Sequence, residues 1–504
     1  MKFLLPIQIA LALIFFGAKA KDFHVLNSAT VSNYVAHFNS MEDENITNLI
    51  SDADSWSWLQ KEIPLFECPD KEVEEIYYFR WWSFRKHLEQ TTNGFVFTEF
   101  LTRATPISSA LGHQIAEGRW LHDQNYLDEY VGYWLRDRDG RQQLHKYSQW
   151  LADALWRRYL VTGDKKTLIA QMDDLVADYR QWEDEKQLKN GMFWQFDVRD
   201  AMEESISGSR TEKNIRPTIN SYMFGNAQAI AKIAELSGNK KLAEEFDAKA
   251  ARLKKLTGQT LWNDDAKFFE VVHTNGQFSG VREQIGFIPW MFDLPDDNKE
   301  YNAAWSQLTD KKGFFAPYGI TTAERRSPFF RTHGYGHCEW DGAVWPFATS
   351  QTLAALGNFL RDYKQSVATE ADYFDAFRTF VHSQYADGKP YIGEYQDEMT
   401  GQWINGKAGR SRYYNHSTFA DLVITGVVGL VPRADNKVEI FPLLPENVWD
   451  YFCLDGVSYH GHTLTIIWDK DGIRYHCGTG LMVLADGKEI ARTVKLEKLT
   501  GKLP

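Results

Sequence analysis

The chain has 504 residues, a formal net charge of −12 and 43% hydrophobic residues. This composition is close to that of an ordinary globular protein, and it excludes a disordered chain, a collagen and a polytopic membrane protein. The acidic balance argues against a nucleic-acid partner, because such binding needs a basic face that neutralises phosphates. Aromatic residues reach 14%, with 18 tryptophans, and aromatic faces beside carboxylates suit sugar-binding clefts.

The first 20 residues have the pattern of a secretory signal peptide. Lys2 supplies a positive start, an apolar run extends from Phe3 to Phe16, and Ala18-Lys19-Ala20 fits a small-x-small cleavage site. No later stretch reaches about 18 consecutive apolar residues, so we expect no membrane span. We therefore expect a secreted protein whose destination is the bacterial periplasm.

Amphipathic helices recur in pairs along the chain, with a glycine between the two members of each pair. Residues 145–160 form one helical pattern, and a second follows Gly163. The arrangement recurs around Gly238, and a third helix is expected to end at Gly357-Asn358, because glycine tolerates the left-handed backbone that ends helices. The unequal spacings argue against a solenoid of fixed period. Together with the long polar loops, they predict a closed (α/α)6 toroid.

From about Val438 the pattern changes to short β-branched runs at residues 438–441, 463–468 and 481–484. Asp-Gly pairs between and after these runs are typical of antiparallel hairpins. We therefore predict a small antiparallel β-sandwich at the C-terminus. The predicted organisation is a signal peptide at 1–20, an (α/α)6-barrel domain at 21–434 and the β-sandwich domain at 435–504.

Four cysteines are too few for a disulfide framework in a secreted chain of this size. Cys453 and Cys477 lie in the β-rich region, where they could pair or be buried as free thiols. No cysteines have C-x-x-C spacing, and no carboxylate or histidine spacing matches a zinc or calcium site. We expect no metal and no cofactor.

Three segments between the expected helices combine carboxylates with tryptophans, at residues 193–207, 313–346 and 391–418. A glycosidase uses one carboxylic acid to protonate the departing oxygen and one carboxylate on the opposite side. An apolar aromatic wall helps to keep the acid protonated near neutral pH. The segments fit a glycosidase, although such clusters also occur in plain acidic loops.

The motifs in these segments, taken in order, resemble those of the α/α-toroid glycoside hydrolases that include trehalase, processing α-glucosidase I and mannosylglycerate hydrolase. Residues 201–205 (AMEES) stand where that group has a Gly-aromatic/Met-Asp-x-Ser motif. Residues 394–401 (EYQDEMTG) resemble its E-x-Y/x-D-x-x-T-G loop. Tyr318-Gly319-Ile320 resembles its subsite loop, and Trp345-Pro346 resembles the start of its next helix.

The resemblance implies inversion of configuration at an α-type glycosidic bond, with Glu394 as general base. It places the general acid at Glu203, where the group has an aspartate, and Asp200 is the alternative. If residues 197–205 are helical, Asp200 and Glu203 are neighbours at i and i+3. In an inverting mechanism the acid and the base lie about 6.5–9.5 Å apart, which leaves room for water.

Around this pair we expect aromatic and polar side chains that bind sugar. Several of them also have structural alternatives: Trp81 could lie in the core, Arg80 in a buried ion pair, and Asp341 at the cap of the helix that follows it. The expected substrate-binding residues are Arg80, Trp81, Glu117, Arg119, Trp120, Trp194, Asp197, Tyr318, Trp340, Asp341, Trp345, Tyr395, Trp403 and His416.

Three classes of function are compatible with the sequence. The leading hypothesis is an exo-acting, inverting glycoside hydrolase whose partner is an oligosaccharide or glycan. A lyase or sugar epimerase would instead use a pair such as His87 and His416, with Glu394 remote. A non-catalytic glycan-binding protein would leave Glu203, Asp200 and Glu394 apart, or hold one of them in an ion pair.

Overall fold

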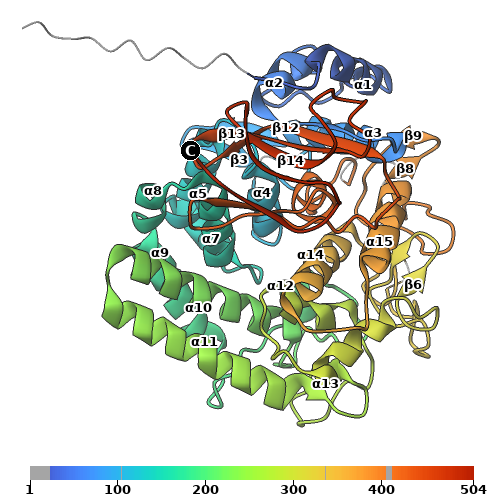
Figure 1. Cartoon of the computed structure of the whole chain (residues 1–504). Helices are drawn as coiled ribbons and strands as arrows, with labels where there is room; N and C mark the ends of the chain where they lie inside the picture. The colour runs from blue at the N-terminus through green and yellow to red at the C-terminus, as the bar shows by residue number, and fades with distance from the viewer. Residues whose placement is uncertain (1–22, 104, 335, 405–410) are drawn as a thin grey trace, which may run out of the picture.

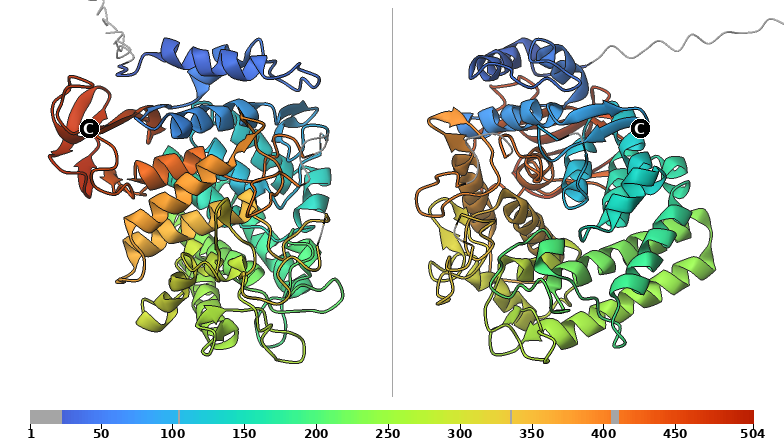
Figure 2. Two further views of the ribbon diagram at one scale, coloured as in Figure 1. Left: turned by 90° about the vertical axis from the view of Figure 1, so that its right-hand side faces the viewer. Right: turned by 180° about the vertical axis from the view of Figure 1, so that it is seen from behind.

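The structure is a computed structural model that describes residues 23–103, 105–334, 336–404 and 411–504. The expected signal peptide lies outside the described residues. Within them, no helix is both long enough and apolar enough to cross a membrane. The chain folds into a large helical body with a β-domain packed against one side of it (Figures 1 and 2).

In the described part of the chain, six helices form a closed inner ring, in which each helix packs on the next and the last packs on the first. In ring order they are α4 (Leu111–Gly118), α7 (Leu151–Thr162), α10 (Pro217–Ser237), α12 (Ile288–Met291), α14 (Pro346–Asp362) and α16 (Ala420–Leu422). This closure confirms the predicted (α/α)6 toroid.

The other helices pack outside this ring or beside it. They are α1 (Ser28–Ser40), α2 (Ser55–Glu62), α3 (Lys71–Arg85), α5 (Asn125–Leu135), α6 (Arg138–Leu144), α8 (Lys165–Ile169), α9 (Met172–Lys186), α11 (Lys240–Leu261), α13 (Lys299–Asn302) and α15 (Glu370–Ser383). Short turns of 3-10 or π type complete the helical body: η1 (Asp197–Arg199), η2 (Gln284–Phe287), η3 (Ala303–Gln307) and η4 (Val423–Val427).

Two of the three predicted glycine junctions are confirmed. Gly163 and Gly238 end α7 and α10 with φ values of 70° and 81°, in the left-handed region. The predicted break at Gly357-Asn358 is wrong, because α14 continues to Asp362. A single interior glycine costs a helix only about 1 kcal/mol, and the packing of α14 between α12 and α15 outweighs that cost.

Two other expectations for helices are also wrong in detail. The helix predicted at 145–160 begins only at Leu151, so the residues before it form a turn. Residues 197–205 are not an α-helix, because η1 ends at Arg199 and both Ala201 and Glu204 have positive φ, at 58° and 65°. Asp200 and Glu203 therefore do not share a helical face.

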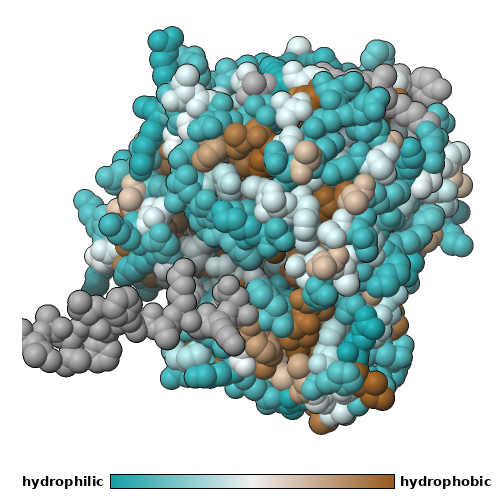
Figure 3. Space-filling view, turned by 90° about the horizontal axis from the view of Figure 1, so that it is seen from above, coloured by the Kyte–Doolittle hydropathy of each residue, from teal (hydrophilic) through white to brown (hydrophobic). Residues whose placement is uncertain are grey.

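Most of the tryptophan excess is in the core. The largest fully buried side chains include eight tryptophans, among them Trp81 and Trp120. Seen from above, the molecular surface is mostly hydrophilic, with separate hydrophobic patches (Figure 3). The high tryptophan content therefore serves mainly to pack the core of the protein, and to a smaller extent to line a sugar-binding cleft.

The C-terminal region forms the predicted antiparallel β-sandwich. One sheet has the strand order β1-β12-β13-β14-β15 and the other has the order β10-β11-β16. The strands are β1 (Leu65–Glu67), β10 (Leu430–Val431), β11 (Lys437–Ile440), β12 (Tyr451–Tyr459), β13 (His462–Asp469), β14 (Gly480–Ala485), β15 (Lys488–Thr493) and β16 (Leu499–Lys502). Strand β1 comes from the N-terminal region, a pairing that the sequence did not reveal.

Four small hairpins lie within the helical body. They are β2 (Leu88–Thr91) with β3 (Gly94–Phe97), β4 (Trp262–Asn263) with β5 (Phe268–Phe269), β6 (Phe315–Ala316) with β7 (Gly319–Ile320), and β8 (Tyr385–Ala386) with β9 (Lys389–Pro390). All four cysteines are free thiols, so Cys453 and Cys477 do not pair.

Asp455 ties the N-terminal segment to the β-sandwich. Its carboxylate is fully buried and accepts hydrogen bonds from the backbone N–H groups of Val25 and Leu26, at 2.7 and 2.9 Å. It also accepts one from the Thr465 hydroxyl at 2.7 Å. The carboxylate therefore satisfies two backbone donors that have no partner in a sheet or helix.

We expect Asp455→Ala to lower the free energy of unfolding by about 2–4 kcal/mol, because it leaves these donors without a charged acceptor. Urea denaturation followed by circular dichroism measures this change. The control is Asp450→Ala in the same domain, whose exposed carboxylate bonds only Lys470 and should cost no more than about 0.5 kcal/mol. Equal effects of the two substitutions would contradict the structural role of Asp455.

Candidate active site

A cavity of about 140 Å³ lies at the end of the toroid where the loops that precede the inner helices meet. Its wall includes Ser109 before α4, Tyr147 before α7, Glu203 before α10, Trp345 at the start of α14 and His416 before α16. The N-terminal ends of these helices therefore lie around the cavity, and their positive dipole ends favour negative charge there.

Glu203 carries a carboxyl group suited to proton donation. Its side chain is half-buried and lines the cavity. Burial, followed by the nearby negative charges of Glu394 and Asp197, raises its pKa to about 7. Close to neutral pH this carboxyl is therefore protonated in a substantial fraction of molecules.

Glu394 lies in the same cavity, on the loop after β9. Its side chain is 3% exposed, and its Oε2 accepts a hydrogen bond of 2.8 Å from the Ser411 hydroxyl. Both carboxyls line this cavity, and the negative charge of Glu394 contributes to the raised pKa of Glu203. The structure thus brings together the two glutamates that the sequence motifs indicated.

An aromatic stack forms one wall of the cavity. The Trp345 ring lies between Trp340 and Tyr395, with ring centroids 4.4 and 4.7 Å apart and nearly parallel planes. The Trp345 indole N–H donates to the Glu339 carbonyl at 3.3 Å, and the Tyr395 hydroxyl accepts from the Cys338 backbone N–H at 3.1 Å. Trp345 lines the cavity, whereas Trp340 and Tyr395 hold it in place from behind.

His416 lines the cavity as a neutral side chain. Burial lowers its pKa well below the ordinary range, and its ring packs edge-on against Tyr414, with centroids 3.9 Å apart. His87 is fully buried away from the cavity, and its Nε2 contacts the Tyr413 carbonyl oxygen at 2.6 Å. The two histidines therefore do not form the pair that a lyase or epimerase would need.

Asp200 is held in an ion pair. Its Oδ2 lies 2.6 Å from Nε of Arg216, and its Oδ1 accepts a hydrogen bond of 2.6 Å from the Ser148 hydroxyl. The Asp200 and Arg216 side chains are both almost completely buried, and Asp200 is not part of the cavity wall. Of the two candidate acids, only Glu203 faces the space that Glu394 lines.

Several expected sugar-binding residues instead hold the ring together. Glu117 accepts hydrogen bonds from the backbone N–H groups of Phe419, Ala420 and Asp421. Arg119 forms an ion pair of 2.6 Å with Asp421. Trp120 also donates to the Asp421 carboxylate, at 2.7 Å. Through these contacts α4, the first inner helix, is joined to α16, the last.

Two more of these residues also lie away from the cavity. Trp81 is fully buried in the core. Arg80 is buried and donates to Gln384 and to Ser417, and it has no ion-pair partner in the part of the chain that the structure describes. Burial lowers the pKa of its guanidinium to about 10.

The remaining residues that were expected to bind sugar lie outside the wall of this cavity. Asp341 does not cap α14, because its carboxylate accepts from the backbone N–H groups of His333 and Gly334. Asp197 accepts from the Val198 N–H, and Trp194 lies beneath the ammonium of Lys186. Tyr318 and Trp403 line a separate open groove that also contains Tyr385 and His382.

The site includes four notable residues that the sequence analysis did not select: Glu99, Arg103, Tyr147 and Tyr414. The helical pattern at 145–160 placed Tyr147 on a core-facing helix, but α7 begins four residues later. Burial, with contributions from Glu203 and Glu99, raises the pKa of Tyr147. A position shortly before an inner helix is a signal that could have identified Tyr147 and Tyr414, which precede α7 and α16.

Two protein families match the chain. Residues 104–417, more than half of it, match the mannosylglycerate hydrolase MGH1-like glycoside hydrolase domain. Residues 432–492 match the C-terminal domain of glycosyl hydrolase family 65. The first match contains both Glu203 and Glu394.

A solved structure named sialidase is 51% identical to this chain and superimposes with a TM-score of 0.93, covering 94% of this chain and 45% of that one. The GH63 mannosylglycerate hydrolase from Thermus thermophilus, in complex with Tris, has a TM-score of 0.52 at 13% identity and covers 69% of this chain and 98% of that one. An uncharacterized protein of Borreliella burgdorferi is 23% identical over 203 residues, which are 40% of this chain and 41% of that protein. Each of these two matches therefore spans less than half the length of the relative, the sialidase or the Borreliella protein.

We expect Glu203→Gln to raise the free energy of unfolding at about pH 8 by about 1–2 kcal/mol, after allowance for solvent screening at a half-buried group. The folded protein keeps the Glu203 proton up to about pH 7, while the unfolded chain releases it near the ordinary value of 4.5. The free energy of unfolding of the wild type therefore falls as pH rises from about 4.5 to about 7. Glutamine does not titrate, so the Glu203→Gln protein does not lose this stability. Urea midpoints at about pH 4 and about pH 8 measure the difference.

The neighbouring Glu204→Gln is the matched control, because Glu204 forms an outward ion pair with Arg210. It should show no gain of stability at alkaline pH. A Glu203→Gln protein that gains as much at acid pH as at alkaline pH would contradict the raised pKa.

Proposed function

The chain belongs to the mannosylglycerate hydrolase MGH1-like glycoside hydrolase family, and we propose that it is an exo-acting, inverting hydrolase of α-type glycosidic bonds. The observation that carries this proposal is the pair Glu203 and Glu394 in one cavity, with the pKa of Glu203 raised to about 7. Glycosidases need such an unequal pair, one carboxyl that keeps its proton and one that does not.

In the proposed mechanism Glu203 donates its proton to the departing glycosidic oxygen. Glu394 takes a proton from a water molecule as that water attacks the anomeric carbon from the opposite face, which inverts the configuration. The hydrogen bond from the Ser411 hydroxyl supports this role for Glu394. It fixes one oxygen of the carboxylate, and this also sets the direction in which the other oxygen points. After product release, Glu394 gives its proton to solvent and Glu203 regains one from solvent, which restores both groups for the next cycle.

The shape of the cavity supports an exo mode of action. A volume of about 140 Å³, enclosed by the loops before the inner helices, suits one terminal sugar unit better than the middle of a long chain. Trp345 and Tyr414 offer ring faces to sugar C–H groups. Glu99, Arg103 and Tyr147 offer donors and acceptors to sugar hydroxyls.

We expect Glu203→Gln and Glu394→Gln each to lower kcat/KM by about 10²–10⁴-fold, as removal of a positioned acid or base generally does. The substrates are mannosylglycerate and 4-nitrophenyl α-glycosides of mannose, glucose, galactose and rhamnose, together with an α-sialoside. Product release is measured by chromatography. Glu204→Gln should keep near-normal activity, and release that persists undiminished in Glu394→Gln would contradict the mechanism.

The wild-type kcat/KM should fall as pH rises above about 7, because Glu203 then loses the proton it must donate. Proton NMR of a reaction with an α-linked D-sugar substrate should show the β-anomer first, with the α-anomer appearing later by mutarotation. If the α-anomer forms first, the reaction retains configuration and the role proposed for Glu394 is wrong.

A further inference from the structure

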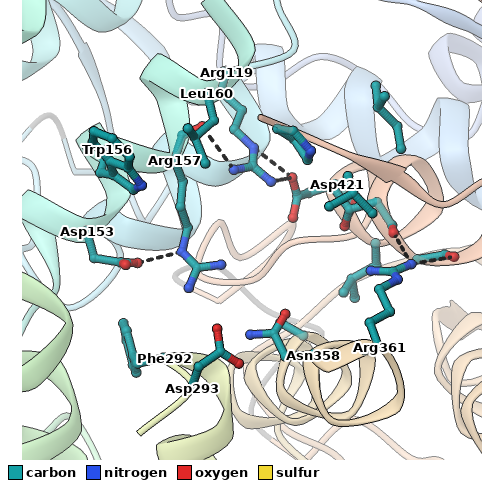
Figure 4. A pocket seen from close by; sticks show the side chains of 18 of the residues that line it. Arg119, Asp153, Trp156, Arg157, Leu160, Phe292, Asp293, Asn358, Arg361 and Asp421 are labelled. Carbon is teal, nitrogen blue, oxygen red and sulfur yellow. Dashed lines mark hydrogen bonds and ion pairs between the residues drawn. The ribbon is translucent and has the colours of Figure 1, made fainter. Parts of the chain in front are cut away.

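A second cavity lies at the opposite end of the toroid (Figure 4). Its volume is about 250 Å³, and its wall comes from the C-terminal halves of α7, α10 and α14 and from residues 430–432 at the start of the β-sandwich. Trp345 of the first cavity and Arg361 of the second lie at the two ends of α14, so the cavities are roughly 24 Å apart.

Several charges in this second cavity have structural explanations. Arg119 pairs with Asp421, and Arg157 pairs with Asp153, each at 2.6 Å. The Arg361 guanidinium donates to backbone carbonyl oxygens, for example that of Phe441 at 2.9 Å. Arginines at the C-terminal ends of helices offset the negative ends of the helix dipoles.

Other polar groups of the cavity have no such explanation. Among the described residues, the side chains of Asp293 and Lys232 have no hydrogen-bond or ion-pair partner, although each influences the pKa of the other. Asn358 uses its amide N–H groups on the carbonyls of Trp290 and Met291, which leaves its carbonyl oxygen available. Figure 4 shows Asp293 and Asn358 pointing toward the guanidinium of Arg157 across the space.

Asp293 is held at the cavity by a strained backbone conformation. Its backbone adopts a left-handed φ of 54°, which costs a non-glycine residue about 1 kcal/mol or more. Partial desolvation by the surrounding cavity wall raises the pKa of Asp293 to about 6 and lowers the pKa of Lys232. Both residues are exposed, so their carboxylate and ammonium groups can bond a ligand in the cavity without first breaking a hydrogen bond within the protein.

We propose that this cavity is a second, non-catalytic binding site for a neutral sugar unit. Sugar hydroxyls both donate and accept hydrogen bonds, which matches acceptors on Asp293 and Asn358 beside donors on Lys232 and Arg157. The Trp156 ring supplies an aromatic surface beside Lys232, whose ammonium lies 5.5 Å from its centroid. A neutral sugar fits better than an acidic one, because the Asp293 carboxylate would repel an anion.

The test is fluorine NMR of protein that contains 5-fluorotryptophan. Trp156→Phe and Trp345→Phe identify the signals that report the second and the first cavity. We expect D-mannose, D-glucose, D-galactose or L-rhamnose to shift the Trp156 signal in a saturable way. Asp293→Asn and Lys232→Met should each weaken that binding by about tenfold, the usual scale of a hydrogen bond to a charged group.

Glu235→Ala, at an exposed position on the same helix as Lys232, is the matched control and should leave the Kd unchanged. Both cavity variants should hydrolyse substrate at the wild-type rate. Three results would overturn the proposal: no saturable shift of the Trp156 signal up to about 100 mM of any of these sugars, wild-type affinity in both cavity variants, or a response to D-glucuronate alone.

Discussion

The buried ion pair between Asp200 and Arg216 is the interaction on which the candidate active site depends. Each side chain is almost completely buried, so its charge is tolerated only because the other lies 2.6 Å away. The pair anchors a turn in which Ala201 and Glu204 both adopt left-handed backbone, a conformation that persists only where surrounding contacts impose it. Glu203, between them, is thereby turned into the cavity, where burial raises its pKa.

Ring closure explains why the two ends of the toroid differ. Glu117 and Phe419 are 302 residues apart in the chain, yet a hydrogen bond between them joins the first inner helix to the last. Closure gathers the loops before the inner helices at one end, together with the helix N-termini and the two glutamates. It gathers the helix C-termini at the other end, where Arg119, Arg157 and Arg361 lie. Helix dipoles favour this distribution of charge.

The sequence predicted the toroid, the β-sandwich and the two glutamates, because each rests on a local pattern. Helical periodicity, and the glycines that end helices, can be recognised in short stretches of sequence. The motifs that contain the acid and the base are also only a few residues long. The sequence was less informative about sugar contacts. Of the expected contacts, Trp345 and His416 line the cavity, while Trp81 is core and Glu117 joins two helices. Residue type alone does not separate these roles.

By itself, the sequence determined the fold class, the family and which carboxylates are candidates for acid and base. Tertiary structure alone decided that Glu203 rather than Asp200 faces Glu394, that strand β1 completes the β-sandwich, and that a second polar cavity forms at the far end. The physical reason is that periodicity and motifs are properties of neighbouring residues. The direction of a side chain and the partner of a buried charge are set by contacts between residues hundreds of positions apart.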